Sequence, residues 1–241
     1  TGNYNEKTSE LYTDLSFIST DQAMGEDATH VFQALCMGEV VDSTKSLWVA
    51  PNCFEPNVIK YIDEQIEACR SGKEGYVFIK VNSLNDMEIM EKLIEASQAG
   101  VKIEMVIRGI CCLCPGVEGY SDNIRIKSIL DDIWKHQDTQ RIFMGSGDLL
   151  NRNTRRRVEV FTEVKSADAR RDIKRLVDAI RMDNQNSWQM LADGSYLKDT
   201  SDHAEPLDSH KYLHEYFEKP LELPAKKHSL RERLFEHFHH K

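Results

Sequence analysis

The sequence of 241 residues lacks any apolar run near the ~18 residues that a membrane-spanning helix needs. It also lacks an initiator methionine and the charged-then-apolar start of a signal peptide, because it begins Thr1-Gly2-Asn3-Tyr4-Asn5. Hydrophobic residues make up 40% and charged residues 29%, a balance typical of a globular protein with a buried core. We expect the middle of a longer, cytoplasmic protein, and membrane association stays an open alternative.

The cysteines lack the second ligand pair that a structural zinc site would need. Cys111 and Cys114 have the spacing of half such a site, yet no further cysteine or histidine pair stands at a matching interval. We therefore expect no metal site, and the scattered positions favour free thiols in a reducing cytoplasm over a disulfide framework. The six cysteines are Cys36, Cys53, Cys69, Cys111, Cys112 and Cys114.

An excess of positive charge is also absent. The net charge of −9 argues against a general nucleic-acid binder, because phosphate backbones favour a basic surface. One local cluster stands out, since four of the six residues from 152 to 157 are Arg152, Arg155, Arg156 and Arg157. With the preceding loop Gly145-Ser146-Gly147-Asp148 they could form a groove that binds phosphate groups or another polyanion. The alternative is a solvated strand edge decorated with arginines.

Hydrophobic periodicity predicts an α/β protein. Short strands alternate with amphipathic helices over residues 76–107, which implies a parallel sheet with a right-handed crossover. Asp193-Gly194 predicts a tight hairpin turn near the end of this region, and residues after 199 are polar. The expected strands are 11–18, 47–50, 76–81, 101–107, 124–126, 142–144 and 158–161, with a hairpin over 188–198. The expected helices are 21–35, one from about Val58 to Gly72, 85–100, 129–134, 167–182, 209–218 and 230–238.

Ligands of an open parallel sheet bind beyond the carboxyl ends of its strands. Asn82 and Ser83 follow one predicted strand, and Arg108 and Gly109 follow the next. A guanidinium at this place could grip phosphate oxygens in pairs, although a structural salt bridge explains it equally well. His136 ends a short predicted helix; it could stabilise a phosphoryl group, whereas a lone histidine there is more often a surface or capping residue.

Several longer segments of the sequence match the pattern of one known family, namely residues 1–8, 11–14, 85–100, 106–111, 115–117, 121–125, 145–153 and 156–159. With these segments the chain resembles the polyphosphate kinase family. The resemblance covers about residues 1–198 and implies a phospholipase-D-like α/β domain with a mixed, largely parallel sheet flanked by helices, plus the end of a similar preceding domain. It divides the chain into residues 1–45, the end of the first catalytic domain, 46–198, the second, and 199–241, a polar tail.

The resemblance also implies a chemistry, the transfer of the terminal phosphate of ATP to polyphosphate through a phosphohistidine. It assigns nucleotide contacts to Tyr12, Arg108 and His136, with His136 also acting in catalysis. The histidine that is phosphorylated in the family precedes the Thr1 segment, so we expect this chain to be inactive alone. Mg²⁺ would neutralise phosphate charge with ligands outside this chain. ATP or ADP, polyphosphate, the N-terminal domains of the same protein and further copies of it are the expected partners.

Two other functions stay open at this point. Relative to the family pattern, the segment between His136 and Arg141 is short by about eight residues, the length of one strand. The chain could therefore be a non-catalytic remnant that binds polyphosphate or nucleotide through Arg108 and the arginine run. In this hypothesis the weak polyphosphate-binding residues are Arg152, Arg155, Arg156 and Arg157. A phospholipase-D-like phosphodiesterase is disfavoured, because that chemistry needs a His-x-Lys pair and His136-Gln137-Asp138 lacks the lysine.

Overall fold

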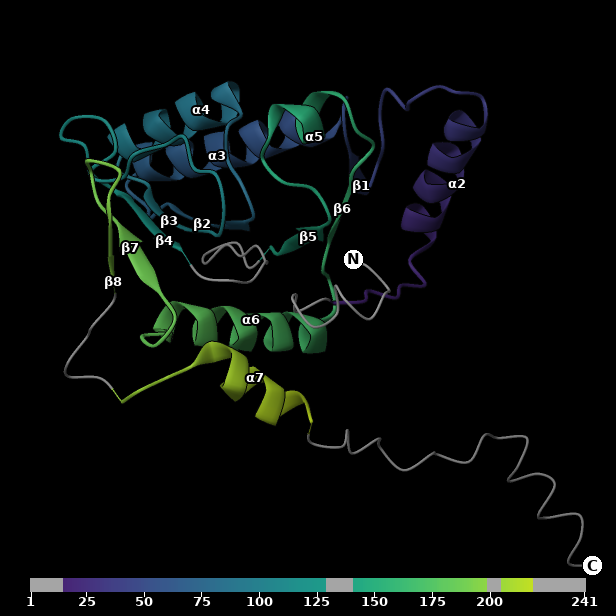
Figure 1. Ribbon diagram of the computed structural model, residues 1–241. Helices are drawn as coiled ribbons and strands as arrows, with labels where there is room; N and C mark the ends of the chain where they lie inside the picture. Colours follow the sequence, from purple (N-terminus) through teal and green to yellow (C-terminus); the bar gives the residue numbers. More distant parts are fainter. Residues whose placement is uncertain (1–14, 129–140, 199–204, 219–241) are drawn as a thin grey trace, which may run out of the picture. The chain divides into compact units, whose positions relative to one another are not determined.

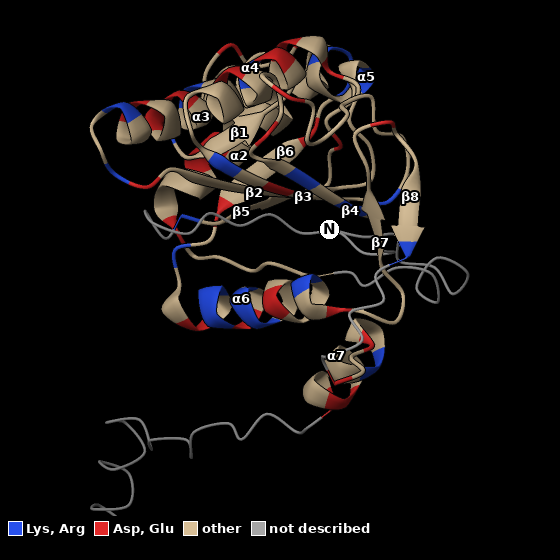
Figure 2. Ribbon diagram, turned by 90° about the vertical axis from the view of Figure 1, so that its left-hand side faces the viewer, with Lys and Arg blue, Asp and Glu red and all other residues tan. Residues whose placement is uncertain are grey.

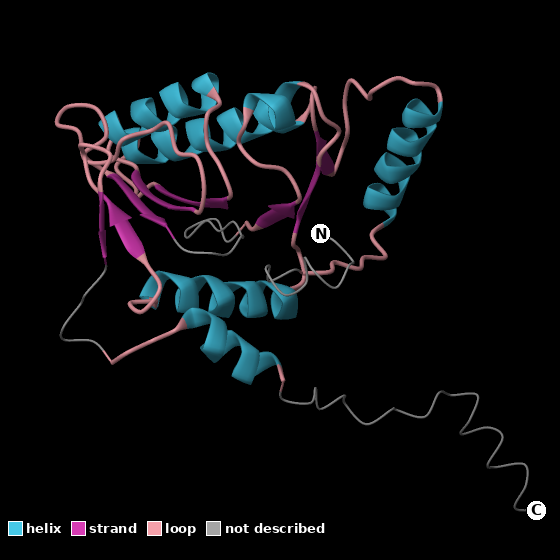
Figure 3. Cartoon of the chain, viewed as in Figure 1, coloured by secondary structure: helices cyan, strands magenta, loops and turns pink. Residues whose placement is uncertain are grey.

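The computed structural model describes residues 15–128, 141–198 and 205–218, and its chain divides between Ser209 and His210 into two compact units (Figures 1 and 3). The helices are α2 (Gln22–Cys36), α3 (Phe54–Arg70), α4 (Met87–Gln98), α5 (Asn151–Arg155), α6 (Ala167–Met182) and α7 (Ser209–Phe217). The strands are β1 (Leu47–Val49), β2 (Tyr76–Val81), β3 (Lys102–Ile107), β4 (Ile124–Ser128), β5 (Phe143–Gly145), β6 (Val160–Glu163), β7 (Trp188–Met190) and β8 (Tyr196–Lys198).

A five-stranded sheet in the order β2-β3-β4-β7-β8 forms the centre of the first unit. Its parallel part joins β2 to β3, with Ile79 opposite Met105, and β3 to β4, with Met105 opposite Ile126. The β7–β8 hairpin adds two antiparallel pairings to this part. The predicted α/β fold, with a mixed sheet flanked by helices, is therefore confirmed.

Both faces of strand β2 are buried, which explains why its residues are apolar except for the buried Lys80. On one face, Val77, Ile79 and Val81 join the main hydrophobic core together with apolar residues of α3 and α4. These two helices cover that face of the sheet, and α6 lies on the opposite side (Figure 1). An ion pair from α6 reaches the sheet there, since Arg181 Nε lies 2.8 Å from Glu104 Oε2.

A second sheet, in the order β1-β6-β5, is entirely antiparallel. Helix α2 packs on it through a small core that contains Met24 and Val31 of the helix and Leu47 and Val49 of β1. The buried carboxylate of Asp27 fixes this packing, because it accepts hydrogen bonds from the backbone N–H groups of residues 45–47. The sequence pattern predicts these strands but not that they form a separate sheet.

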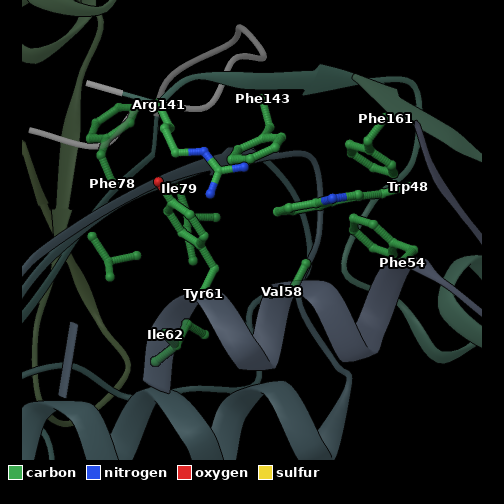
Figure 4. Close-up of a pocket in the computed structure, with 11 residues that line it drawn as sticks. Trp48, Phe54, Val58, Tyr61, Ile62, Phe78, Ile79, Arg141, Phe143 and Phe161 are labelled. Carbon is green, nitrogen blue, oxygen red and sulfur yellow. The ribbon is translucent and has the colours of Figure 1, made fainter. Parts of the chain in front are cut away.

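An aromatic cluster packs between the second sheet and α3 (Figure 4). The rings of Trp48 and Phe143 stack with centroids 3.9 Å apart, and Tyr61 meets Phe143 edge-on at 5.3 Å. The Arg141 guanidinium lies 5.1 Å from the centre of the Tyr61 ring and also bonds the Glu163 carboxylate through two N–H groups. The space left among these side chains is only about 40 Å³, so the cluster is packed core.

Most predicted elements agree with the structure within a few residues. The hairpin is confirmed, but its turn spans residues 192–194 with Gly194 at φ 81°, one residue longer than the two-residue primed turn that Asp-Gly favours. The predicted strand 11–18 is wrong over residues 15–18, which have no regular structure. Residues 11–14, the helix 129–134 and the helix 230–238 lie outside the described residues.

Candidate functional site at the carboxyl edge of the sheet

The ends of β2 and β3 meet at one edge of the parallel sheet, as predicted from the sequence. The N–H of Gly109 donates to the Asn82 carbonyl at 2.7 Å, which places Arg108 beside the end of β2. A side chain at position 109 would sit 3.1 Å from both the Asn82 carbonyl and the Ser83 hydroxyl. Glycine thus allows the two strand ends to approach each other closely, and Arg108 is half-buried at their junction.

Asp148 connects a third segment to this edge. Its Oδ1 accepts hydrogen bonds from the backbone N–H groups of Asn82, at 2.7 Å, and Ser83, at 3.1 Å. The loop that carries Asp148 continues the contact, since the Leu149 N–H donates to the Ser83 carbonyl. The carboxylate thus occupies two backbone donors that an anionic ligand could otherwise use, and phosphate at this edge would depend on side chains such as Arg108.

A polar cluster around the buried side chain of Asn153 lies beside the same loop, and the sequence analysis missed it. The Asn153 amide donates to Glu159 Oε1 at 2.7 Å, and the Ser146 hydroxyl donates to Glu159 Oε2 at 3.0 Å. Asn153 is only 4% exposed, and its Oδ1 has no hydrogen-bond partner among the described residues. The sequence gives one signal for this cluster: Ser146 lies between two glycines, and Asn153 lies within the arginine run.

The arginine run lies on α5 and the turn that follows it, where Figure 2 shows basic residues. Arg155 contacts three carboxylates, with N–O distances of 3.2 Å to Glu55, 2.9 Å to Glu88 and 3.9 Å to Asp86. Arg152 and Arg156 are exposed and line a groove of about 630 Å³ together with Arg155. The structure thus separates the four predicted residues, because Arg157 does not line this groove.

The carboxylates around Arg155 perturb one another. Burial is the main cause that raises the pKa of Glu55 to about 7, and the negative charges of Asp86 and Glu88 raise it further. Arg155 opposes these effects only in part. Asp86 is fully buried, caps α4 through the Ile89 N–H, and accepts a 2.7 Å hydrogen bond from the Thr154 hydroxyl of α5. This cluster fixes α5 against α3 and α4.

Two predicted site residues, Tyr12 and His136, lie outside the described residues, so their roles stay predictions. The magnesium ligands, which we expect outside this chain, also stay a prediction. At the edge of the sheet, the described acidic side chain is Asp148, whose Oδ1 already accepts two backbone hydrogen bonds. Asp148 alone therefore does not provide the set of oxygen ligands that Mg²⁺ prefers, and the magnesium site stays a prediction.

All six cysteines lie in the described residues, and none forms a disulfide. Burial raises the pKa of the Cys111 thiol to about 11, so this side chain stays protonated at neutral pH. No helix in the described part of the chain combines the length and apolar character needed to cross a membrane.

The geometry defines an α/β protein whose parallel strands end beside an arginine suited to phosphate. The family model for the polyphosphate kinase C-terminal domain 2 matches residues 47–210, and that for C-terminal domain 1 matches residues 1–40. This chain belongs to the polyphosphate kinase family. The domain boundaries predicted from the sequence stay predictions.

Relatives extend the comparison. The chain is 38% identical over 206 residues to a polyphosphate kinase of Prochlorococcus marinus (strain MIT 9313). This match covers 82% of this chain and 29% of the relative. The chain is also 38% identical over 221 residues to the polyphosphate kinase of Staphylococcus haemolyticus (strain JCSC1435), covering 88% of this chain and 30% of the relative. The crystal structure of the Porphyromonas gingivalis polyphosphate kinase matches with a TM-score of 0.83 and 26% identity, over 90% of this chain and 35% of that one. The chain thus spans about a third or less of these proteins.

Proposed function

We propose that the complete protein is a cytoplasmic, homo-oligomeric polyphosphate kinase that transfers the terminal phosphate of ATP to polyphosphate. The transfer would proceed in two steps. A histidine nitrogen attacks the γ-phosphorus and ADP leaves, and a terminal oxygen of polyphosphate then attacks the phosphohistidine and releases the histidine. We expect the phosphorylated histidine in the part of the protein that this chain does not cover.

The observation that supports a role of this chain in phosphate transfer is the position of Arg108 at the junction of β2 and β3. Its backbone is fixed by the close approach of Gly109 to Asn82, and it follows a strand that is buried at its end. A planar guanidinium at this edge can bind the oxygens of a nucleotide phosphate and stabilise the charge that develops during transfer. Tyr12 would pack or hydrogen-bond near the nucleotide, and His136 would stabilise the transferring phosphoryl group. Mg²⁺, when bound, would neutralise phosphate charge.

Calorimetric titration of ATP into this chain tests the assignment. We expect Arg108→Ala and His136→Ala each to weaken ATP binding by about tenfold or more, because each removes a hydrogen bond to a charged group. Arg171→Ala is the matched control for Arg108, since Arg171 lies on α6 and pairs with Asp168 at 2.9 Å. Unchanged affinity in the Arg108 variant would show that Arg108 has a structural role instead.

The second candidate is a non-catalytic remnant that binds polyphosphate or nucleotide. The exposed arginines of the groove beside α5 favour this candidate, because they could bind a polyanion without any chemistry. An assay of polymer synthesis by the complete protein separates the two functions. Synthesis of polyphosphate from ATP supports the kinase, whereas binding of both ligands without turnover supports the remnant.

A further inference from the structure

The groove beside α5 begins where the candidate site ends. Ser83 belongs both to the end of β2 and to the wall of the groove, and Ile110, which follows Arg108 and Gly109, lines it as well. The groove continues from there along α5, where Arg152 and Arg156 contribute exposed guanidinium groups. A ligand held by Arg108 could therefore extend along α5 without leaving the surface of the protein.

The charges in the groove are not all available to a ligand. Arg155 is held by Glu55, Glu88 and Asp86, so its positive charge is already compensated. Arg152 and Arg156 differ, because neither forms an ion pair with a residue in the described part of the chain. No carboxylate of a described residue lines the groove. Within the described residues, the positive charge of the groove that no carboxylate pairs with therefore belongs to Arg152 and Arg156.

The spacing of these two residues fits a repeating anion. The N–H of Arg156, the residue that caps the end of α5, donates to the Arg152 carbonyl at 3.2 Å, so the two residues lie about one turn apart. Both guanidiniums can therefore contact neighbouring groups of one extended ligand. Guanidinium binds phosphate oxygens in pairs. Asn85 and Asn151 add amide groups to the wall, where the Asn151 N–H donates to Asn85 Oδ1 at 3.0 Å. Charge complementarity thus favours a linear chain of phosphates.

We propose that this groove binds a stretch of the polyphosphate chain through Arg152 and Arg156, next to the phosphate-transfer site. The proposal rests on the proposed function and deepens it. It also assigns a different role to Arg155, which anchors α5 through its carboxylate partners and does not contact the polymer.

The test is calorimetric titration of polyphosphate of defined length into this chain at two salt concentrations. We expect the double variant Arg152→Gln, Arg156→Gln to bind polyphosphate at least about tenfold more weakly at low salt and with a smaller salt dependence, because fewer cations contact the polymer. The control is Arg171→Gln, Lys174→Gln, which removes two exposed positive charges from α6. The control is expected to bind within about twofold of the unchanged chain.

The outcomes separate the groove from the proposed function when ATP is titrated into the same samples. Weaker polyphosphate binding with unchanged ATP binding supports the groove. Equal polyphosphate affinity in the double variant and the unchanged chain overturns it while leaving the ATP site intact, and so does an equal loss in the control. Single-stranded DNA that displaces polyphosphate with higher affinity would overturn the choice of ligand. Failure of the unchanged chain to bind either ligand would overturn both proposals.

Discussion

Glu55→Gln should make the stability of the protein less dependent on pH. The side chain of Glu55 is 10% exposed, and burial together with Asp86 and Glu88 raises its pKa to about 7. The native state therefore keeps a proton between pH ~4.5 and pH ~7 that the unfolded chain releases. This contribution to stability is fully present below the pKa of the unfolded chain and is lost as the pH rises through the pKa of about 7 in the folded protein. Glutamine stays neutral and keeps an N–H donor for Glu88.

The expected magnitude follows from the two pKa values. A difference of about 2.5 units corresponds to at most about 3.4 kcal/mol, and we expect about 1–2 kcal/mol because solvent screens the partners. Arg155 and Glu88 are 46% and 58% exposed in their side chains, which is why the full value does not apply. From pH 5 to pH 8, the free energy of unfolding of the Glu55→Gln variant should therefore rise by about 1–2 kcal/mol relative to that of the unchanged chain.

Urea unfolding of both proteins at the two pH values measures this gain. Glu67→Gln serves as the control, because Glu67 is an exposed residue of the same helix. Its stability should differ from that of the unchanged chain by the same amount at both pH values. If the difference in stability between the Glu55 variant and the unchanged chain is also the same at pH 5 and pH 8, the carboxylate cluster does not hold the proton and the reasoning is refuted.

Three further substitutions test the packing by thermal or urea unfolding. Gly145→Ala should destabilise the protein by about 1–3 kcal/mol, because the new methyl group would lie 2.6 Å from the Val160 carbonyl and closer still to the ring of Phe161; an unchanged melting temperature would contradict this. Gly25→Ala should stabilise it by about 0.5–1 kcal/mol, since this exposed position of α2 has no neighbour within 4 Å of the new methyl group, and a loss of stability would be the opposite result. Asp183→Ala should cost about 2–3 kcal/mol, because Oδ2 accepts two 2.7 Å hydrogen bonds from buried Ser209, whose donors would lose their partner; a cost below that of a surface substitution would argue that water replaces the carboxylate.

The helices and parallel strands were predictable because local sequence determines them. The spacing of Ile173, Leu176 and Ile180 gives α6 its buried face, and Ser166 caps it through the Ala169 N–H. The largely apolar run of β2, from Tyr76 to Ile79, is typical of a strand buried on both faces. The edge with Arg108 follows from the same information, since parallel strands place their carboxyl ends together.

Long-range contacts set the limits of the sequence analysis. The second sheet pairs Leu47 with Thr162, and neither strand alone indicates its partner. The role of Arg155 depends on Glu55, which lies 100 residues away along the chain, and a run of four arginines gives no sign that one of them is fixed by carboxylates. The short helix α5 also escaped prediction, because its five residues have neither a side-chain cap nor an apolar period.

Polymer synthesis by the complete protein carrying Arg108→Ala tests the central claim most directly. We predict that the rate of polyphosphate formation from ATP falls by about 10²–10³-fold or more, because a group that stabilises developing phosphate charge is lost, while the circular dichroism spectrum and melting temperature stay unchanged. Near-normal synthesis by the variant would contradict the claim that this edge of the sheet binds the transferring phosphate.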